Sequence, residues 1–319
     1  MTIKTRKIAI IGAGNVGSHC GFSLATQGEV DEIVFIDTNK KRAVSEALDL
    51  ADAISFLPHH VSAYAGDYGD CADSDIVVIS AGPLPRADQT RLDTLSDTIK
   101  VLKENNTLKQ IVESGFDGIF ICISNPADVI ADYVRKNTGF PSSKVFSTGT
   151  TLDSSRLKRA LARELKLSEK SLGAYSLGEH GGSQMVPWSH VTVGGKSLLE
   201  LIKEKPETYG KLNLVELQEE TRFSGYSVLI GKGSTEFGIS SGVTDIVKAI
   251  FHNENRILTL STYLDGEYGQ SGLYISVPVV VGKEGIKEVI ELNLTNEEKK
   301  LFDYSCDVIR EYIAIADSL

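Results

Sequence analysis

The chain has 319 residues, of which 41% are hydrophobic and 24% charged, a composition typical of a globular protein with a large core. Its formal net charge of −10 at pH 7 argues against a nucleic-acid surface, because phosphate binding needs a basic face and the sequence has no lysine- or arginine-rich stripe. No run approaches the roughly 18 apolar residues of a membrane span. We therefore expect a cytoplasmic protein with no nucleic-acid partner and no membrane partner.

Five short apolar runs divide the first half of the chain. They are rich in β-branched residues and continuous rather than alternating, which is typical of strands buried on both faces of a parallel sheet. The runs are KIAII (7–11), EIVFI (32–36), DIVVIS (75–80), GIFICIS (118–124) and KVFST (144–148). Helical patterns lie between them, the longest over residues 90–115. This alternation predicts an α/β fold with a doubly wound parallel sheet, a Rossmann domain over residues 1–148.

The second half has a different pattern and predicts an α+β domain over residues 149–319. Residues 151–166 have a helical pattern, and residues 217–251 indicate a long interrupted helix. Between them, residues 177–193 are irregular or strand-like. We expect this half to carry the substrate site.

The C-terminal region predicts a hairpin and a closing helix. Residues 273–292 contain two strand-like runs joined across residues 282–285. Thr295 and Glu298 have capping-box spacing ahead of an amphipathic helix. The apolar residues on one side of that helix are Leu301, Tyr304, Val308, Ile309 and Tyr312.

The cysteines and most histidines show no motif for metal binding. The four cysteines are scattered singly with no C-x-x-C pair, so buried free thiols are expected and no metal site is predicted. Five of the six histidines have no obvious partners, and His190 is expected to be structural.

A glycine motif directly after the first predicted strand indicates a dinucleotide site. IAIIGAGNVG supplies Gly12, Gly14 and Gly17 for a tight turn, a close approach of pyrophosphate and tight helix packing. The helix that follows would face the phosphates with its unpaired N–H groups. Asp37 ends the second strand 20 positions after Gly17, where a carboxylate accepts from a ribose hydroxyl and repels a 2′-phosphate. The cofactor expected is NAD; a cap or turn role for Asp37 is the alternative.

Polar residues elsewhere could supply acid/base chemistry. Asp153 and Arg156 are three apart on a predicted helix and share a face, either as a surface ion pair or as an orienting carboxylate and a substrate-binding guanidinium. His180 stands between Glu179 and two glycines, which we interpret as space for ligands. Arg91 ends a polar segment that alone would be an ordinary loop.

Five ordered motifs together resemble the L-lactate and malate dehydrogenase superfamily, most nearly its bacterial L-lactate and L-2-hydroxyacid branch. The motifs are GAGNVG (12–17), SAG…TRLD (80–93), ISNPAD (123–128), TGTTLDSSR (148–156) and SLGEHGGS (176–183). The resemblance extends from Ile8 to the terminal helix. It implies reversible NADH-dependent reduction of a small 2-keto acid to the 2-hydroxy acid, catalysed by a homodimer or homotetramer.

The resemblance also implies a role for each matched residue. His180 would donate the proton to the substrate oxygen, Asp153 would orient the imidazole, Arg156 would bind the substrate carboxylate, and Arg91 would polarise the reacting carbonyl. The residues implied in cofactor binding are Gly12, Gly14, Asn15, Val16, Gly17, Asp37, Ala81, Gly82, Ile123, Asn125 and Thr148. The residues implied in substrate binding are Pro85, Arg91, Asn125, Arg156 and Thr235.

Two positions depart from the family pattern. The loop position that usually holds Gln in lactate enzymes and Arg in malate enzymes is Pro85, followed by Arg86. We therefore expect pyruvate first, a bulkier 2-keto acid such as 2-ketoisocaproate second and oxaloacetate third. The Arg and His that bind fructose 1,6-bisphosphate in many bacterial relatives correspond to Lys158 and Gly173, so activation should be weak or absent.

Two other functional classes are compatible with a dinucleotide domain. One is an NAD-dependent glycoside hydrolase, although such enzymes generally need a metal held by Cys and His, and no cysteine lies near His180 in the sequence. The other is a redox-sensing module that binds NAD without turnover, which the combination of Asp153, Arg156, His180 and Arg91 argues against.

Overall fold

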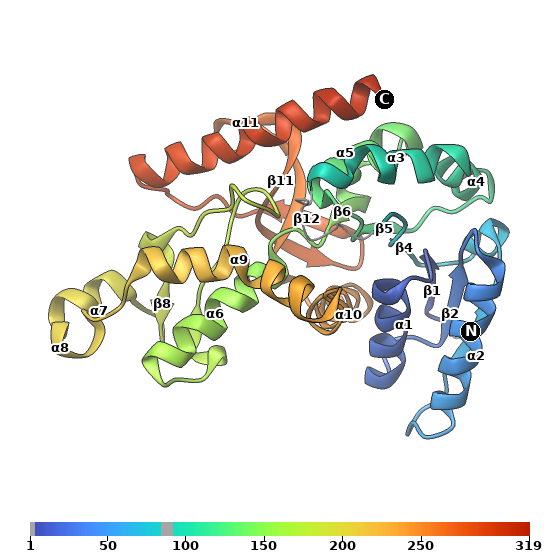
Figure 1. Cartoon of the computed structure of the whole chain (residues 1–319), viewed down its shortest axis with the longest axis horizontal. Coiled ribbons are helices and arrows are strands. Elements are labelled where there is room, and N and C mark those ends of the chain that lie inside the picture. The colour runs from blue at the N-terminus through green and yellow to red at the C-terminus, as the bar shows by residue number, and fades with distance from the viewer. Residues whose placement is uncertain (1–3, 84–91) are drawn as a thin grey trace.

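Nine strands form one mixed sheet in the order β12-β11-β10-β6-β5-β4-β1-β2-β3. The computed structural model describes residues 4–83 and 92–319 of the chain. In Figure 1 the first strands lie at the right, in blue, and the long C-terminal helix α11 crosses the top of the molecule. None of the helices in these described ranges combines the length and the apolar character of a membrane span.

The N-terminal half of the sheet is parallel and is confirmed as a Rossmann fold. Its strands are β1 (Lys7–Ile11), β2 (Glu32–Ile36), β3 (Ser62–Ala65), β4 (Ile76–Ile79), β5 (Ile119–Cys122) and β6 (Val145–Ser147). Strands β1, β4, β5 and β6 are buried along their whole length, as their continuous apolar runs predict. The strand order reverses between β1 and β4, and ligands of this fold bind at that switch point.

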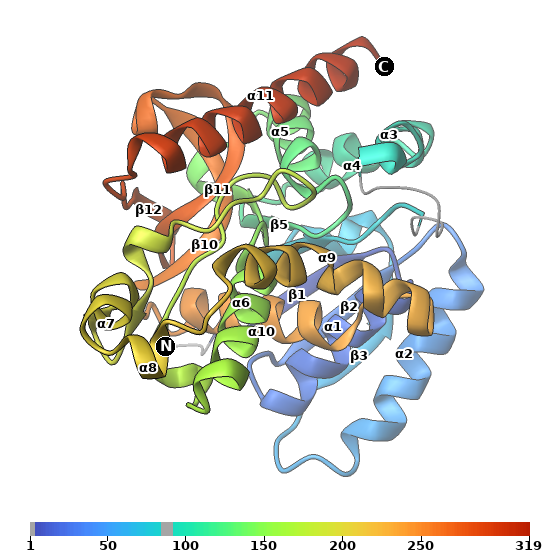
Figure 2. The ribbon, with the colours of Figure 1, turned by 60° about the vertical axis from the view of Figure 1, so that its left-hand side comes forward.

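Helices cover both faces of the sheet. In the first half they are α1 (Asn15–Gln27), α2 (Lys40–Ile54), α3 (Leu95–Glu104), α4 (Thr107–Glu113) and α5 (Ala127–Thr138). The second half of the chain contains the helices α6 (Thr151–Leu165), α7 (Leu198–Glu204), α8 (Pro206–Tyr209), α9 (Leu214–Lys232), α10 (Phe237–Phe251) and α11 (Asn296–Ser318), of which α7 and α8 pack against each other. Helix α10 packs beside α1, so the two halves of the chain meet next to the first strand (Figure 2).

The second half of the chain extends the same sheet with antiparallel strands. These are β10 (Arg256–Asp265), β11 (Ser271–Gly282) and β12 (Gly285–Val289). Strand β10 joins the parallel half by pairing with β6, where Ser261 lies opposite Ser147. A separate small sheet contains β7 (Leu172–Gly173), β8 (Thr192–Val193) and β9 (Lys196–Ser197). The two halves therefore share one sheet.

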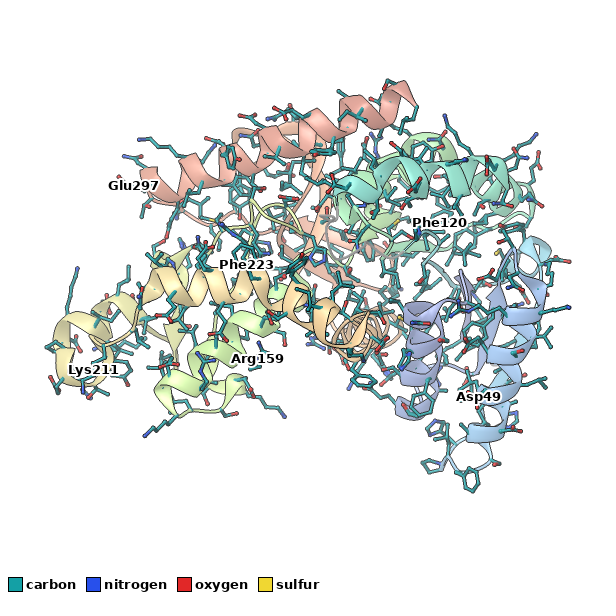
Figure 3. The ribbon with its side chains drawn as sticks, viewed as in Figure 1. Asp49, Phe120, Arg159, Lys211, Phe223 and Glu297 are labelled. Atoms are coloured by element: carbon teal, nitrogen blue, oxygen red, sulfur yellow. The ribbon has the colours of Figure 1, made fainter. Side chains whose placement is uncertain are left out.

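The described residues form two apolar cores, and the larger extends across this join. The larger surrounds the nine-stranded sheet and includes Phe120 on β5, labelled in Figure 3. The smaller lies around α6 and the small sheet and includes Leu157, Leu161 and Val191. The four cysteines are buried free thiols, as expected.

The structure differs from the predicted elements in three places. The helix expected over residues 90–115 is divided into α3 and α4, because Asn106 adopts a left-handed conformation with φ of 48°. Asparagine tolerates that conformation better than most residues. Strands β3 and β10 were missed: β3 has only four residues with no apolar run, and β10 alternates threonine and serine with leucine.

The capping box of α11 is confirmed, and the side of the helix that is buried in the core differs from the apolar side that the sequence predicts. Thr295 Oγ1 accepts from the Glu298 N–H, and the Glu298 carboxylate accepts from the Thr295 N–H. The residues that face the core are Phe302, Ser305, Cys306, Ile309, Ile313 and Ala316. Of the predicted set only Ile309 is buried, whereas Tyr304 is 62% exposed. Three residues of the predicted apolar side, Tyr304, Val308 and Tyr312, line a cavity instead.

Candidate active site

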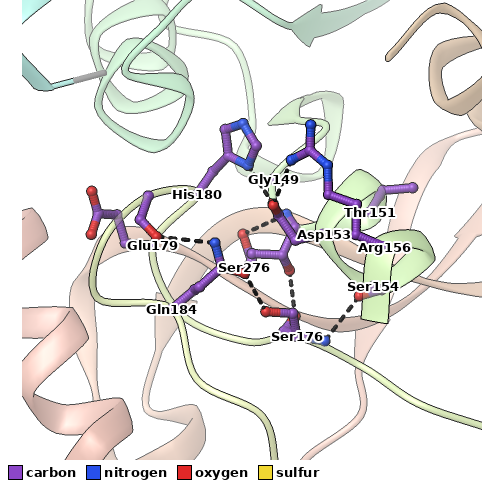
Figure 4. Close-up of polar contacts among 12 residues, drawn as sticks. Gly149, Thr151, Asp153, Ser154, Arg156, Ser176, Glu179, His180, Gln184 and Ser276 are labelled. Carbon is purple, nitrogen blue, oxygen red and sulfur yellow. Dashed lines mark hydrogen bonds and ion pairs between the residues drawn. The ribbon is translucent and has the colours of Figure 1, made fainter. Parts of the chain in front are cut away.

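Three of the predicted side chains form a continuous polar contact. His180 Nδ1 lies 2.6 Å from Asp153 Oδ2, and Arg156 Nη1 donates to Asp153 Oδ1 at 2.9 Å (Figure 4). Asp153 is fully buried, and the His180 side chain is 11% exposed. A buried carboxylate that binds one imidazole nitrogen fixes the ring orientation, which is the geometry of an acid/base histidine.

The start of α6 positions the two charged partners of His180. Asp153 and Arg156 lie one turn apart on this helix, so their side chains share a face, as their spacing predicts. Asp153 is also in the first turn, where the positive end of the helix dipole favours a carboxylate.

The segment that carries His180 is irregular and depends on its glycines. A backbone bridge joins Leu177 to Met185, and Gly178 adopts a φ of +92° between them. A Cβ at Gly181 would lie 2.0 Å from Glu179 Oε1, because that buried carboxylate turns back to accept from the Ser183 N–H at 2.8 Å. The Cβ direction of Gly181 is therefore filled by Glu179, although Gly181 itself lines the cavity described below.

Gly182 differs from Gly181, since no atom of the described residues would lie within 4 Å of a Cβ added there. The interpretation as open space holds for this residue.

A chain of hydrogen bonds connects this segment to α6 beneath the ring. The Ser176 N–H donates to Ser154 Oγ at 2.9 Å, and the Ser176 hydroxyl donates to Gln184 Oε1 at 2.8 Å. The Gln184 amide then donates to the Gly181 carbonyl at 3.0 Å. These residues are drawn below His180 in Figure 4. The loop is thereby tied to the helix that supplies Asp153.

A cavity of about 710 Å³ opens beside His180 and collects residues from both halves of the chain. The predicted site residues that line it are Val16, Ile123, Asn125, Thr148, Arg156, His180 and Thr235. An apolar lobe between α9 and α11 includes Phe223, labelled in Figure 3, together with Tyr226, Tyr304 and Val308. The cavity therefore contains both a polar catalytic wall and an aromatic wall.

The glycine turn performs the three tasks that its spacing predicts. Gly12 has a φ of +100°, and a Cβ there would lie 2.6 Å from the Ser80 carbonyl oxygen. A Cβ at Gly17 would lie 2.0 Å from the Gly12 carbonyl oxygen, so helix and turn are in direct contact. Gly14, in contrast, meets nothing within 4 Å among the described residues. The backbone at the start of α1 is thus open to a pyrophosphate, and the site fits a dinucleotide.

Asp37 lies at the far end of this site, away from the cavity lining. Its carboxylate accepts from the Ala13 N–H and from the Asn39 N–H, both at 2.8 Å. Asn15 accepts from Arg42 beside it at 2.9 Å. The carboxylate is therefore held by the glycine turn itself.

The remaining predicted cofactor residues lie at the ends of β4 and β5. Ala81 accepts through its carbonyl from the Ser124 hydroxyl. Gly82 has a φ of +133°, and a Cβ there would lie 2.8 Å from Thr98 Oγ1. The same helix α3 contacts the next strand end, because Thr98 donates to the Asn125 carbonyl at 2.8 Å.

Two predicted substrate residues, Pro85 and Arg91, lie outside the described residues, and so does Arg86. Their roles stay predictions. Lys158 Nζ lies 6.0 Å from the centroid of the Tyr175 ring. Lys158 also lines a second cavity, and Gly173 is not among the described residues that line it.

The structure also adds residues that the sequence interpretation missed. Asp128 belongs to the motif ISNPAD, in which the sequence predicted a site role only for Asn125. Ser276 gave no local signal, because its strand contains many β-branched residues and one serine is unremarkable in such a run. Tyr304 and Val308 were predicted on one side of an amphipathic helix, without a role in the site.

Fold and site together define a nicotinamide-dependent oxidoreductase: a Rossmann switch point with an open glycine turn, and an imidazole–carboxylate pair beside it. Sequence models of the lactate/malate dehydrogenase NAD-binding domain and of the lactate/malate dehydrogenase α/β C-terminal domain match residues 6–147 and 150–317. The chain belongs to the lactate/malate dehydrogenase family, and its N-terminal part is the family's NAD-binding domain. The predicted family, fold class and cofactor are confirmed.

Individual relatives cover almost the whole chain. L-lactate dehydrogenase 3 of Bacillus cereus is 46% identical over 313 residues, which are 98% of each chain. The ligands-bound structure of the minor L-lactate dehydrogenase of Enterococcus mundtii has a TM-score of 0.93 at 36% identity, covering 98% of this chain and 99% of that one. Malate dehydrogenase of Cryptosporidium parvum has a TM-score of 0.91 at 29% identity, covering 99% and 100%. The fold is thus shared by enzymes named for lactate and for malate.

Within the described residues, no group of three or more His, Cys, Asp and Glu side chains is arranged to hold a metal ion.

Proposed function

We propose that this protein catalyses the reversible reduction of pyruvate to L-lactate with NADH. The observation that carries the proposal is the 2.6 Å contact between His180 and the buried Asp153, placed in the wall of the cavity that Val16 and Ile123 also line. The names of relatives at 46% and 40% identity support lactate as the product.

The cofactor would lie along the glycine turn with its adenosine ribose at Asp37 and its nicotinamide end in the cavity. NADH supplies the hydride for this chemistry. The residues proposed to hold it are Gly12, Gly14, Asn15, Val16, Gly17, Asp37, Ala81, Gly82, Ile123, Asn125 and Thr148. The carboxylate of Asp37 repels a 2′-phosphate, which favours NAD over NADP.

His180 acts as the proton donor in keto-acid reduction and as the base in the reverse direction. Asp153 holds Nδ1, so the proton is transferred through Nε2 at the opposite side of the ring. When the carbonyl carbon is reduced, its oxygen gains negative charge, and a protonated imidazole both stabilises that charge and neutralises it. Such acid/base assistance contributes roughly 10² to 10⁴-fold in rate.

Arg156 binds the substrate carboxylate through its guanidinium, which presents two parallel N–H donors. Its contact with Asp153 keeps it at the cavity wall next to the imidazole. Arg91 would polarise the reacting carbonyl, and Asn125, Thr235 and Pro85 would border the substrate. Local cations of this kind let a protein of net charge −10 bind an anion.

A bulkier 2-keto acid is the second candidate, favoured by the apolar lobe of the cavity between α9 and α11. Phe223, Tyr226, Tyr304 and Val308 offer apolar contacts that a methyl group alone does not use. Oxaloacetate is the third candidate.

The deciding experiment follows NADH oxidation with pyruvate, 2-ketoisocaproate and oxaloacetate in parallel. The proposal expects the highest kcat/KM with pyruvate. A preference for 2-ketoisocaproate would assign the lobe to substrate side chains, and a preference for oxaloacetate would place Arg86 at the discriminating position. Failure to reduce any of the three would refute the proposed function.

Assembly, location and regulation are proposed on the family resemblance alone. We propose a homodimer or homotetramer that works in the cytoplasm without activation by fructose 1,6-bisphosphate, because Lys158 and Gly173 replace the usual Arg and His. Sedimentation analysis tests the assembly. A pyruvate saturation curve that shifts strongly to lower concentration with the bisphosphate at neutral pH would refute the last point.

A further inference from the structure

The proposed proton donor and its carboxylate come from segments that are far apart in the backbone. His180 stands on an irregular loop, and Asp153 stands on α6, 27 residues earlier. Their contact keeps a useful length only if the two backbones are held at a fixed separation. A misplacement of about 1 Å in such a site costs on the order of 10²-fold in rate.

Asp128 anchors the loop at His180 itself. It is the second residue of α5, directly after the strand end that carries Asn125, and it is only 1% exposed. Its Oδ2 accepts from the His180 backbone N–H at 2.9 Å. Its Oδ1 faces the Ser276 hydroxyl, which donates to it across 3.4 Å. One side chain therefore contacts both the catalytic loop and strand β11.

Ser276 connects this anchor to the helix that carries Asp153. Its hydroxyl accepts from the Thr150 N–H at 3.1 Å, three residues before Asp153. Its backbone exchanges two hydrogen bonds with Gly178, two residues before His180, at 3.0 and 3.1 Å. Ser276 is fully buried, in the middle of β11. A single residue of the sheet thus touches both segments that must be aligned.

A glycine permits this convergence. Gly149 has a φ of +46°, and a Cβ there would lie 2.4 Å from Ser276 Oγ. Any larger residue at this position would push the start of α6 away from the serine. The same Cβ would also lie 2.6 Å from the Ser261 backbone nitrogen on β10, so the start of α6 packs directly on both strands at this glycine.

From these contacts we infer that Asp128 and Ser276 form a positioning pair, which holds the backbone of His180 at the distance from α6 that its contact with Asp153 requires. The inference rests on the proposed function, in which that contact serves proton transfer. Neither residue is among the described residues that line the cavity, so both act through His180 and α6 rather than on the substrate.

The burial of Asp128 fits a geometric role better than a role as a charge. Burial raises the pKa of Asp128 to about 7, with the hydroxyl of Ser261 and the His180 amide acting in the opposite direction. A carboxyl group that is partly protonated near neutral pH still accepts from an N–H through its carbonyl oxygen. Asparagine, which has the same shape and no charge, should therefore replace it.

The test compares Asp128→Ala with Asp128→Asn in the full-length protein, assayed for pyruvate reduction and for NADH binding by fluorescence. Asp128→Ala should lower kcat about 10²-fold with the NADH Kd within twofold of the wild type. Asp128→Asn should restore kcat to within about threefold. Ser276→Ala should lower kcat about tenfold, because it removes the hydroxyl contacts with Asp128 and with α6 but leaves the contact between Asp128 and the His180 N–H.

Asp132 provides a matched control on the same helix. It is a carboxylate one turn further along α5, 2% exposed, and it pairs with Lys136 at 2.8 Å, away from the site. Asp132→Ala should lower the melting temperature but leave kcat unchanged. If Asp132→Ala and Asp128→Ala reduce kcat equally, the effect of Asp128 is on general stability and the inference is wrong.

A readout independent of turnover separates this inference from the proposed function. The His180 Nδ1 proton that is shared with Asp153 should give a downfield NMR signal, assigned by its loss in His180→Gln. That signal should shift or vanish in Asp128→Ala and persist in Asp128→Asn. If it does so while no 2-keto acid is reduced, the proposed function fails and the positioning pair stands. An unchanged signal in Asp128→Ala, or equal losses of kcat in the Ala and Asn variants, would overturn the pair.

Discussion

The two ends of the site are built in opposite ways. The cofactor end is local: its glycines and Asp37 belong to one strand–helix–strand unit, and its contacts are made mostly by backbone atoms. The acid/base end is assembled from four separate segments, whose side chains Asp128, Asp153 and Ser276 are at most 1% exposed. Local geometry suffices to hold a phosphate, whereas proton transfer needs side chains fixed by tertiary packing.

The strongest way to test this division is to remove His180. His180→Ala should lower kcat for pyruvate by roughly 10² to 10⁴-fold and leave the NADH Kd nearly unchanged, because the ring does not build the glycine turn. Steady-state kinetics and fluorescence titration measure the two quantities. His190→Ala is the control, since that ring contacts Ser189 outside the described cavity lining and should leave kcat unaffected. Parallel loss of NADH binding in His180→Ala would make the residue structural.

Two glycines separate cofactor contact from folding within the cofactor end. Gly14→Ala should weaken NADH binding at least tenfold with little change in melting temperature, because its Cβ enters only open space at the phosphate site. Gly17→Ala should destabilise the whole chain by about 1–3 kcal/mol, because its Cβ overlaps the Gly12 carbonyl. Calorimetry and NADH titration distinguish the two effects. A folded Gly14→Ala variant with unchanged affinity would contradict the assignment of the turn.

Asp37 tests the electrostatic part of the same end. Asp37→Asn removes the charge that repels a 2′-phosphate and retains an oxygen for one of the two N–H groups, of Ala13 and Asn39, which donate to separate carboxylate oxygens. The ratio of kcat/KM with NADPH to that with NADH should rise about fivefold, equivalent to ~1 kcal/mol. Arg42, whose guanidinium donates to Asn15 at the start of α1, offers a cation for the 2′-phosphate of NADPH. An unchanged ratio would mean that Asp37 serves only as a turn residue.

Asp128→Asn should have the smallest effect on turnover, within about threefold, but a clear effect on stability. The pKa of this carboxyl is raised from 3.8 to about 7 by burial, and the charge of Glu179 acts in the same direction. The folded state then binds the proton more tightly than the unfolded state, so wild-type stability falls as pH rises from about 4 to 7. Asp128→Asn should lose this dependence, and its free energy of unfolding at pH 8 should exceed that of the wild type by at most about 4 kcal/mol, measured by denaturant unfolding at each pH. If the stability of the wild type relative to Asp128→Asn increased with pH, the raised pKa of Asp128 would be contradicted.

The same contrast explains what the sequence could and could not predict. Gly12, Gly14, Gly17 and Asp37 were predicted from spacing, because their contacts lie within one supersecondary unit. The contact of Asp153 with His180 needed the family resemblance, since no local pattern aligns two segments 27 residues apart. Ser276 could not be predicted at all, because its role depends on which segments meet at the centre of β11. Long-range register is the information that a single sequence does not display.

The join between the two halves of the sheet has a consequence for dissection of the molecule. Ser147 on β6 lies opposite Ser261 on β10, and both are fully buried. A fragment that ended after β6 would uncover a row of backbone N–H and C=O groups along that strand, a template for intermolecular pairing. The nucleotide-binding half thus has the topology of a domain, but one edge of its sheet is covered only by strand β10 of the second half.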